Sequence, residues 1–426
     1  MTTLLQQLLP PTNGFFPLDT AINQGGNRVS AFNVYLNRQL ALQRRKRLTI
    51  CTGALVSRLD LDGQMGIVRG VYVQQAREKP GDSSKDYFVK ASSEVIICSG
   101  AISTPQILDL SGIGPKTIFH DLGIPIMKEL PAVGARLADH YAIPLMHEVP
   151  KKETIGILAS IWGLWHFLLW LVVGKGLMST TSVLSAIFLQ TETMNRNGIP
   201  DIEIMIIPFN SFERDVPGHS LFSLYPTLVQ PRSFGRVEVV ERDPSSNPPG
   251  VKVARRAVRF TMRLAEEFQN SRYPYPASLA FAPGNRPDLL REWEKLSPHK
   301  SSNVPHPETI ASALAAASAK NDDGAGAKAA VIEGKTWRDV TDDDIDDYMR
   351  RVAHMAFHFS CTYPTSSSEE TGVVDDRLRV HGFRNLRIAD ASVFPVIHSG
   401  HTMAPVMMVA ERCADFVKSN WEETAE

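Results

Sequence analysis

The fold of this 426-residue chain is decided by Asn385-Leu-Arg-Ile-Ala-Asp-Ala-Ser-Val-Phe-Pro395, which is followed by Ser399-Gly-His401-Thr-Met-Ala-Pro405. The first segment is a short apolar run that ends in an Asp-Ala-Ser turn, a pattern typical of a buried strand that meets a polar turn. Upstream lies His358-Phe-Ser-Cys-Thr362, so His358 and His401 bracket the strand. Histidine has a pKa near neutrality and is therefore a natural group to accept or donate a proton. The two segments predict an acid–base site near the end of the chain.

A second motif lies at Ser99-Gly-Ala-Ile-Ser-Thr-Pro-Gln-Ile-Leu-Asp-Leu-Ser-Gly-Ile-Gly114. An apolar strand over residues 88–97 precedes it, and Ser and Thr before Pro105 predict a helix over residues 103–111. Small residues let the backbone approach a ligand, and a helix N-terminus offers free N–H groups. Taken alone, this pattern describes an ordinary βα unit.

Other segments predict further strands and helices. Short runs rich in β-branched residues predict strands over residues 48–57, 67–75, 200–208 and 221–241, the last two in an antiparallel sheet. Helices are expected over residues 341–356, where acidic side chains begin the segment and basic ones end it, and over residues 402–418. The Ala-rich residues 311–331 read as a mobile insert or linker.

Composition narrows the class of protein. Apolar residues make up 43% of the chain and charged residues 21%, which is typical of a globular protein of two domains or one large one. The net charge of −1 gives no basic footprint for nucleic acid. The four cysteines stand far apart and lack metal-type spacing, so reduced structural thiols are expected, with Cys98 as a small core residue.

One segment could contact a membrane. Residues 155–173 are almost wholly apolar and include Trp162, Trp165 and Trp170, but His166 and two glycines weaken a spanning helix. The alternatives are an apolar helix packed within a domain and a helix that lies on a membrane surface. The first residues lack a basic segment followed by a long apolar core, so no signal peptide is expected and a cytoplasmic location is favoured.

The two motifs together resemble the signatures of the glucose-methanol-choline (GMC) flavin oxidoreductases. That family has a histidine before a Gly-Val-Val-Asp element, here residues 372–375, and a His or Asn after the Asp-Ala-Ser turn. Residues 27–36, 48–56, 122–125, 130–134, 137–140 and 230–239 are also similar to the family. Arg136 and Ala138 stand where its members usually have Asn and Gln.

The resemblance implies FAD as cofactor and a CH–OH group as the substrate. It assigns the catalytic-base position to His358 or His401, and we expect His401 to be the base and His358 its partner, which together would remove the hydroxyl proton while hydride leaves from carbon. The cofactor-binding residues that it implies are Val56, Ser99, Gly100, Asp390, Ala391, Thr402 and Met403. The acidic run Asp342–Asp347 is expected to be a solvated helix start, and no metal site is expected.

The family holds the flavin pyrophosphate with a Gly-x-Gly-x-x-Gly turn, and no such string occurs in this sequence. The expectation is therefore a chain truncated at its N-terminus relative to the family. Three functions remain open: an FAD-dependent oxidoreductase acting on a small, lipophilic alcohol, a flavin-independent cyclase or isomerase of secondary metabolism that uses the same histidines, and an inactive remnant.

The expected fold is α/β with mixed α+β character. An incomplete, Rossmann-like FAD-binding domain is expected over residues 1–140 and 371–426. A substrate-binding domain with an antiparallel sheet and helices is expected over residues 141–370. The expected partner is a small molecule, with no nucleic acid, and the oligomeric state stays open.

Overall fold

The computed structural model describes residues 14–75, 85–181, 183, 185–190, 199–212, 216–237, 251–271, 274–275, 277–295 and 334–423. The chain forms two compact units. Unit 1 comprises residues 1–41, 141–228 and 250–354, and unit 2 comprises residues 42–140, 229–249 and 355–426. The expected mixed α/β fold with an antiparallel sheet is confirmed. The units are defined by compactness alone, so the expected division into an FAD-binding and a substrate-binding domain stays a prediction.

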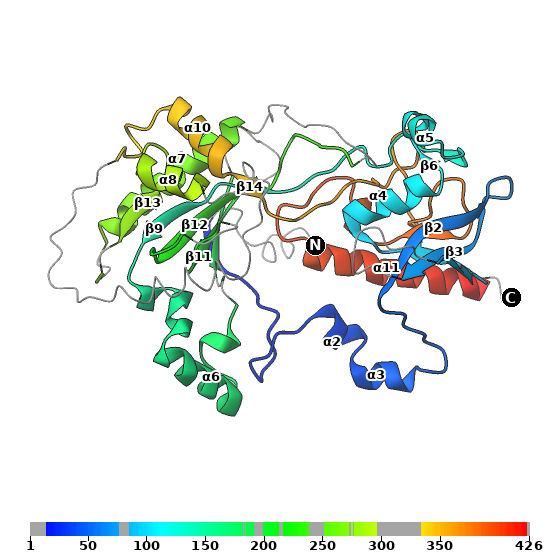
Figure 1. Ribbon diagram of the computed structural model, residues 1–426, viewed down its shortest axis with the longest axis horizontal. Helices are drawn as coiled ribbons and strands as arrows, with labels where there is room; N and C mark the ends of the chain where they lie inside the picture. Colours follow the sequence, from blue (N-terminus) through cyan, green and yellow to red (C-terminus); the bar gives the residue numbers. More distant parts are fainter. Residues whose placement is uncertain are drawn as a thin grey trace, which may run out of the picture. The chain divides into compact units, whose positions relative to one another are not determined.

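Unit 1 is built on an antiparallel sheet (Figure 1). Its strands follow the order β1-β10-β11-β12-β8-β14, and β9 pairs with both β12 and β13. Their bounds are Gly14–Pro17 for β1, Tyr141–Ala142 for β8, Leu145–Glu148 for β9, Ser185–Leu189 for β10, Ile202–Ile207 for β11, Leu221–Leu228 for β12, Ser278–Phe281 for β13 and His354–Met355 for β14, which begins at the last residue of the unit. The two strands expected over residues 200–241 are β11 and β12. β12 ends at Leu228, well before the expected end at residue 241.

Helices cover the sheet of unit 1 and extend from it. α7 (Val251–Gln269) packs against the sheet, where Ala257 and Ala265 meet Ile202 and Leu228. The other helices are α2 (Ala31–Tyr35), α3 (Arg38–Gln43, which runs into unit 2), α6 (Ile161–Val173), α8 (Pro287–Lys295), α10 (Asp342–Val352) and the short 3-10 turns η1 (Lys151–Glu153), η2 (Ile155–Ala159) and η3 (Leu177–Ser179). The acidic run Asp342–Asp347 forms the first turns of α10, where Thr341 and Asp344 make a capping box. The Ala-rich insert expected over residues 311–331 lies outside the described residues.

Unit 2 combines an antiparallel meander with two parallel strand pairs. The meander consists of β2 (Ala54–Asp62), β3 (Ile67–Gln75) and β4 (Tyr87–Lys90); the parallel pairs are β5 (Val95–Ile97) with β15 (Leu386–Ile388), and β6 (Ile113–Gly114) with β7 (Lys128–Glu129). The single strand expected over residues 88–97 is therefore wrong. Its first part pairs with β3 and its second part with β15, and the chain turns between them.

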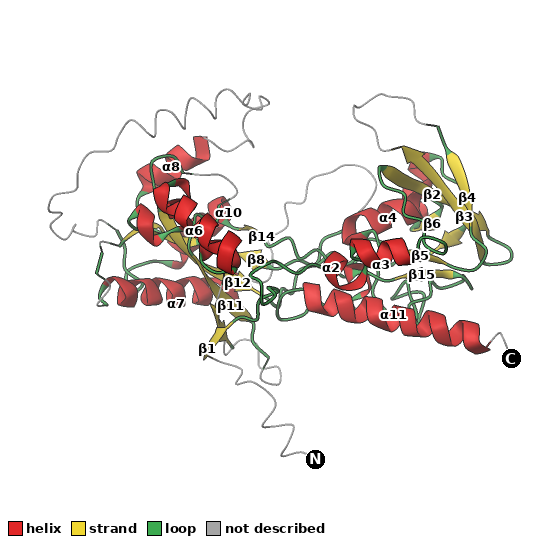
Figure 2. Ribbon diagram, turned by 90° about the horizontal axis from the view of Figure 1, so that it is seen from below, coloured by secondary structure: helices red, strands yellow, loops and turns green. Residues whose placement is uncertain are grey.

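The helices of unit 2 are α4 (Gly100–Leu110), α5 (Lys116–Leu122), the turn η5 (Ala391–Val393) and the long α11 (Met403–Glu423), which Figure 2 shows beneath β15 and β5. Cys413 of α11 packs into a core that includes Leu108, Val374 and Ile388. α4 begins three residues earlier than expected, because Asp390 supplies the acceptor for its first N–H group from another part of the chain.

Two further expectations concern cysteines and membranes. Cys98, expected in the core, is exposed at the end of β5, whereas Cys361 and Cys413 are buried. Among the described residues, no helix combines the length and apolar content that crossing a membrane requires.

Candidate active site

A cluster of three imidazole rings lies in unit 2. The Nδ1 atoms of His140 and His358 are 2.9 Å apart, and their ring centroids are 4.9 Å apart. The His401 ring lies 5.3 Å from that of His358, also measured between centroids. The structure therefore brings the two predicted histidines together and adds a third. We call His140, His358 and His401 the histidine cluster.

The loop that carries His358 is held in an uncommon backbone conformation. Phe357 and Cys361, on either side of it, have φ angles of +60° and +68°, which L side chains rarely adopt. The surrounding contacts maintain this conformation, because the N–H of His358 donates to Asp139 Oδ1 at 2.7 Å and Ser360 exchanges two backbone hydrogen bonds with Ala138. Strain of this kind is kept where a side chain must be precisely placed.

His140 determines the arrangement of protons in the cluster. Its side chain is buried, and burial is the main cause that lowers its pKa to about 4; the neighbouring His358 lowers it further. The ring is therefore neutral near pH 7. Its Nε2 lies 2.9 Å from the carbonyl oxygen of His398, which can only accept, so Nε2 carries the hydrogen.

The tautomer of His140 fixes the tautomer of His358. A neutral His140 that is protonated at Nε2 has a lone pair at Nδ1, so His358 donates to it from its own Nδ1–H. When His358 is neutral, its lone pair is then on Nε2.

Asp139 adds a carboxyl group next to the cluster. Burial raises its pKa to about 6, although hydrogen bonds from the N–H groups of His358 and His140 act in the opposite direction. Its Oδ2 atom is buried without a hydrogen-bond partner. Asp139 and His140 were missed as site residues in the sequence, where they were noted only as part of a family-like segment. An Asp-His pair in such a segment, with histidines elsewhere, was the available signal.

The turn before His401 is also fixed. The amide Nε2 of Gln230 donates to Ser399 Oγ at 2.6 Å. The N–H of Val406 donates to the carbonyl of Thr402, so helix α11 starts directly after His401. Thr402 is half-buried and Met403 is exposed. His354 lies outside the cluster: its Nε2 is 2.8 Å from the Tyr225 hydroxyl in unit 1, and helix α10 ends before it, at Val352.

Asp390 joins the two sequence motifs. Its Oδ2 accepts hydrogen bonds of 2.9 Å from the N–H of Gly100 and from the Thr104 hydroxyl, and its Oδ1 accepts from the N–H of Ser392 at 2.9 Å. These bonds place Ala391 and Gly100 at the carboxyl ends of β15 and β5. In parallel α/β sheets, ligands bind at this edge. Gly100 has a φ of +78°, and an added Cβ there would meet open space.

Unit 2 contains a groove of roughly 370 Å³ that is lined by some of the residues predicted to hold FAD. It brings together Val56 of β2 and Ser99 before α4, which are far apart in the sequence. The rest of its lining is mainly apolar and includes Leu59, Val71, Val89, Ile97, Cys98 and Ile107. The lining and the open space at Gly100 fit part of a flavin dinucleotide. No residue of the sequence supplies the glycine-rich pyrophosphate turn.

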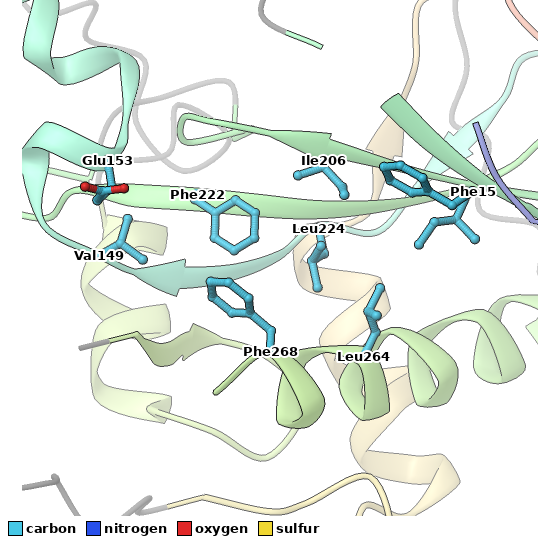
Figure 3. A pocket seen from close by; sticks show the side chains of 9 residues that line it. Phe15, Val149, Glu153, Ile206, Phe222, Leu224, Leu264 and Phe268 are labelled. Carbon is cyan, nitrogen blue, oxygen red and sulfur yellow. The ribbon is translucent and has the colours of Figure 1, made fainter. Parts of the chain in front are cut away.

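Unit 1 contains a pocket of different chemistry, with a volume of roughly 420 Å³ (Figure 3). It lies between the sheet and α7, and the tilted rings of Phe222 and Phe268 line it with their centroids 5.4 Å apart. Figure 3 shows Glu153 at one end and Phe15 toward the other. The remaining lining residues are aliphatic: Val149, Ile187, Ile206, Leu224 and Leu264. We call this the apolar pocket. Among the described residues, no group of side chains is arranged to hold a metal ion.

Comparison with known proteins gives the class of the molecule. Two family models described as GMC oxidoreductase match residues 12–142 and 231–410. The chain belongs to this family, and the resemblance expected from its motifs is confirmed. The match supports FAD as the cofactor.

Individual relatives share less than a third of their aligned residues with this chain. An oxygen-dependent choline dehydrogenase of Pseudomonas aeruginosa (strain LESB58) is 28% identical over 414 residues, which are 95% of this chain and 62% of that protein. A second one, of Pseudomonas putida, is 27% identical over 418 residues, again 95% of this chain and 62% of the relative. The chain therefore spans less than two thirds of the length of these relatives.

Solved structures share the fold. A formate oxidase matches with a TM-score of 0.68 and 20% identity, covering 94% of this chain and 64% of its own. An FAD-dependent oxidoreductase from Chaetomium thermophilum matches with a TM-score of 0.66 and 19% identity, covering 96% of this chain and 68% of its own. At these identities the likeness establishes the fold alone.

Proposed function

We propose that this chain acts as an FAD-dependent oxidoreductase that oxidises a CH–OH group. The observation that carries the proposal is the histidine cluster, in which the rings of His358 and His401 lie next to each other and His140 fixes the tautomer of His358. Membership of the GMC family favours this activity over a redox-neutral cyclase or isomerase and over an inactive remnant. The relatives include choline dehydrogenases, whose substrate carries such a group.

His358 and His401 would act on the substrate hydroxyl. One ring removes the proton while the other donates a hydrogen bond to the oxygen, which holds the substrate in a reactive orientation. The sequence favoured His401 as the base. The bond from His358 Nδ1–H to His140 instead favours His358 as the base, because it leaves a lone pair on Nε2, with His401 as the donor. FAD, when bound, supplies the acceptor for the two electrons that leave the carbon.

The residues proposed to hold FAD are those at the carboxyl ends of β5 and β15, together with the groove. Ser99 and Gly100 offer small side chains and backbone at this edge, and Val56 offers apolar surface. Ala391, Thr402 and Met403 follow the strand end and begin α11. Asp390 contributes through these neighbours, because its carboxylate already accepts bonds from Gly100, Thr104 and Ser392.

A small, lipophilic alcohol is the proposed substrate. The lining of the apolar pocket supports it, because nearly every side chain there is hydrocarbon. Such a substrate partitions into bilayers, so contact with a membrane surface through residues 155–173 fits the same proposal.

The test is an absorbance spectrum of the purified chain in the flavin bands, with and without added FAD. We expect a flavin band that survives desalting and bleaches when straight-chain alcohols are added without oxygen. Alcohols with longer carbon chains should bleach it more readily. His401→Ala and His358→Ala should keep the band and lose the bleaching. A well-folded chain that retains no flavin would contradict the proposal. A band that bleaches equally in both variants would remove the histidines from it.

A further inference from the structure

α6 presents an apolar surface that unit 1 leaves uncovered. The helix reads Ile-Trp-Gly-Leu-Trp-His-Phe-Leu-Leu-Trp-Leu-Val-Val, and only Gly163 is buried. The side chain of Val172 is 77% exposed and that of Ile161 is 76% exposed. The exposed apolar side chains of the helix are Ile161, Trp162, Leu164, Trp165, Phe167, Leu168, Leu171, Val172 and Val173. A helix that is apolar on all sides requires an apolar environment on all sides.

The covered side of α6 is a narrow stripe. Gly163, His166 and Trp170 are spaced three and four residues apart, so they share one face of the helix. Gly163 packs against the backbone of Leu158, and Trp170 Nε1 donates to the carbonyl of Gly26 at 3.1 Å. The rest of the circumference is free of the unit, and Figure 1 shows α6 extending away from the sheet strands β11 and β12.

The helix is firmly joined to unit 1. Just before it, the N–H of Ile155 donates to the carbonyl of Pro208, and the Thr154 and Ser220 hydroxyls are 3.0 Å apart. Ser160 caps its first turn, and Gly174 ends it in the left-handed conformation. The uncovered surface is therefore a fixed part of the fold.

The charges around α6 point to an anionic lipid surface. Lys151 and Lys152, followed by Glu153, precede η2, and Lys175 follows α6, whereas no acidic residue occurs between residues 154 and 181. Lys152 lies over the ring of Tyr275, and Lys151 and Lys175 are exposed. Tryptophans in an apolar segment with cations at both ends are typical of a structure at the lipid–water boundary. A second copy of the chain fits less well, because a two-fold pairing of α6 with itself would bring lysine against lysine.

The length of α6 decides how it meets the bilayer. Its 13 residues span about 20 Å at the usual rise of an α-helix, well below the roughly 30 Å of a hydrocarbon core. We infer that α6, with the adjoining turns η2 and η3, is a membrane-docking element that inserts into one leaflet of an anionic phospholipid bilayer. It deepens the membrane contact proposed above, and it stands independently of the alcohol chemistry.

Vesicle flotation of the full chain tests the inference. Vesicles of phosphatidylcholine with phosphatidylserine should carry the protein, and brominated acyl chains should quench its tryptophan fluorescence. Val172→Glu and Leu164→Glu should each weaken partitioning at least about tenfold, because a carboxylate in the hydrocarbon region is costly. Met65→Glu is the matched control, since Met65 is 59% exposed in unit 2 and should leave partitioning unchanged.

Substitution of the lysines tests the electrostatic contribution to vesicle binding separately. The double change Lys151→Gln with Lys175→Gln should weaken binding to the anionic vesicles about tenfold or more and leave binding to pure phosphatidylcholine unchanged. Wild-type protein that binds neither vesicle, or binding that Val172→Glu leaves intact, overturns the inference. Self-association that Val172→Glu abolishes, without vesicle binding, assigns the surface to a second copy instead. His401→Ala should dock like wild type, so a failure of the catalytic proposal would not imitate a failure of docking.

Discussion

The histidine cluster of unit 2 and the apolar pocket of unit 1 bury their side chains under opposite conditions. In the cluster, His140 is buried and its ring nitrogens are held by the His398 carbonyl and by His358, whereas His358 is half-buried and His401 is exposed. In the pocket, the surface is hydrocarbon and the carboxylate of Glu153 lies at one end (Figure 3). Burying a polar group is costly unless it is hydrogen-bonded, whereas burying hydrocarbon is favourable. Replacing one hydrogen-bonding atom should therefore disrupt the cluster, whereas the pocket tolerates changes in the shape of its side chains.

The largest expected effect is on catalysis. His358→Ala and His401→Ala should each lower the turnover rate by about 10²–10⁴-fold, the usual contribution of a positioned acid or base. His120→Ala is the control, since His120 is exposed on α5 and should keep the wild-type rate. The rate of flavin bleaching under alcohol measures all three. If the two cluster variants differ, the slower one identifies the base.

Acid sensitivity should appear in both units. His147 of unit 1 is buried beside Phe222 and Phe268, and burial lowers its pKa to about 4, as it does for His140 in unit 2. A histidine with a lowered pKa stays neutral in the folded state while the unfolded chain takes up a proton. Stability is therefore complete above the ordinary pKa near 6.5 and falls between pH 6.5 and 4, by on the order of 3 kcal/mol for each residue.

His147→Phe should remove this loss from unit 1 alone. Five of the six tryptophans, residues 162, 165, 170, 293 and 337, belong to unit 1, so urea unfolding followed by tryptophan fluorescence reports mainly on that unit. The variant should lose less stability between pH 7 and pH 4 than the wild type. His120→Ala, in unit 2, should lose as much as the wild type. Equal losses in all three proteins would show that His147 is not protonated on unfolding.

A smaller effect concerns the pH profile of the cluster. Burial raises the pKa of Asp139 to about 6, so its carboxylate becomes charged as the pH rises through that value. A negative charge beside His358 stabilises the imidazolium that forms when the base takes its proton, so the rate should rise through pH 6. Asp139→Asn keeps an oxygen acceptor for the His358 N–H and should flatten this rise, with a rate at pH 8 several-fold lower. A profile that keeps its step near pH 6 assigns the step to another group.

The smallest effect is expected in the apolar pocket. Glu153→Leu should strengthen the binding of an apolar fluorescent probe to unit 1 about threefold, because the pocket loses its charged end. Flavin binding should stay unchanged, because the residues proposed to hold FAD belong to unit 2. Glu370→Leu, an exposed change in unit 2, is the control for added surface hydrophobicity. A similar gain in both variants would mean that the probe does not occupy the pocket.

Local patterns predicted several elements well. β3, α10 and α11 lie within a few residues of their expected ranges, because their caps and apolar periodicity are written in adjacent residues. The start of α4 was predicted three residues too late, since its cap comes from Asp390, which is 290 residues away. The prediction of a single strand over residues 88–97 was wrong for a similar reason. Its two halves are apolar in sequence, and only their different partners separate them.

The sequence by itself determined the family, the mixed α/β class and the two histidines worth testing, because motif spacing and residue chemistry are local properties. Only the tertiary structure decided that His140 and Asp139 join those histidines, and which nitrogen of His140 and of His358 carries the hydrogen. It also decided that α6 is left uncovered, although its apolar sequence is equally suited to a buried helix. The physical reason is common to both outcomes. Burial, pKa and exposure depend on which distant residues meet, and spacing along the chain does not specify those meetings.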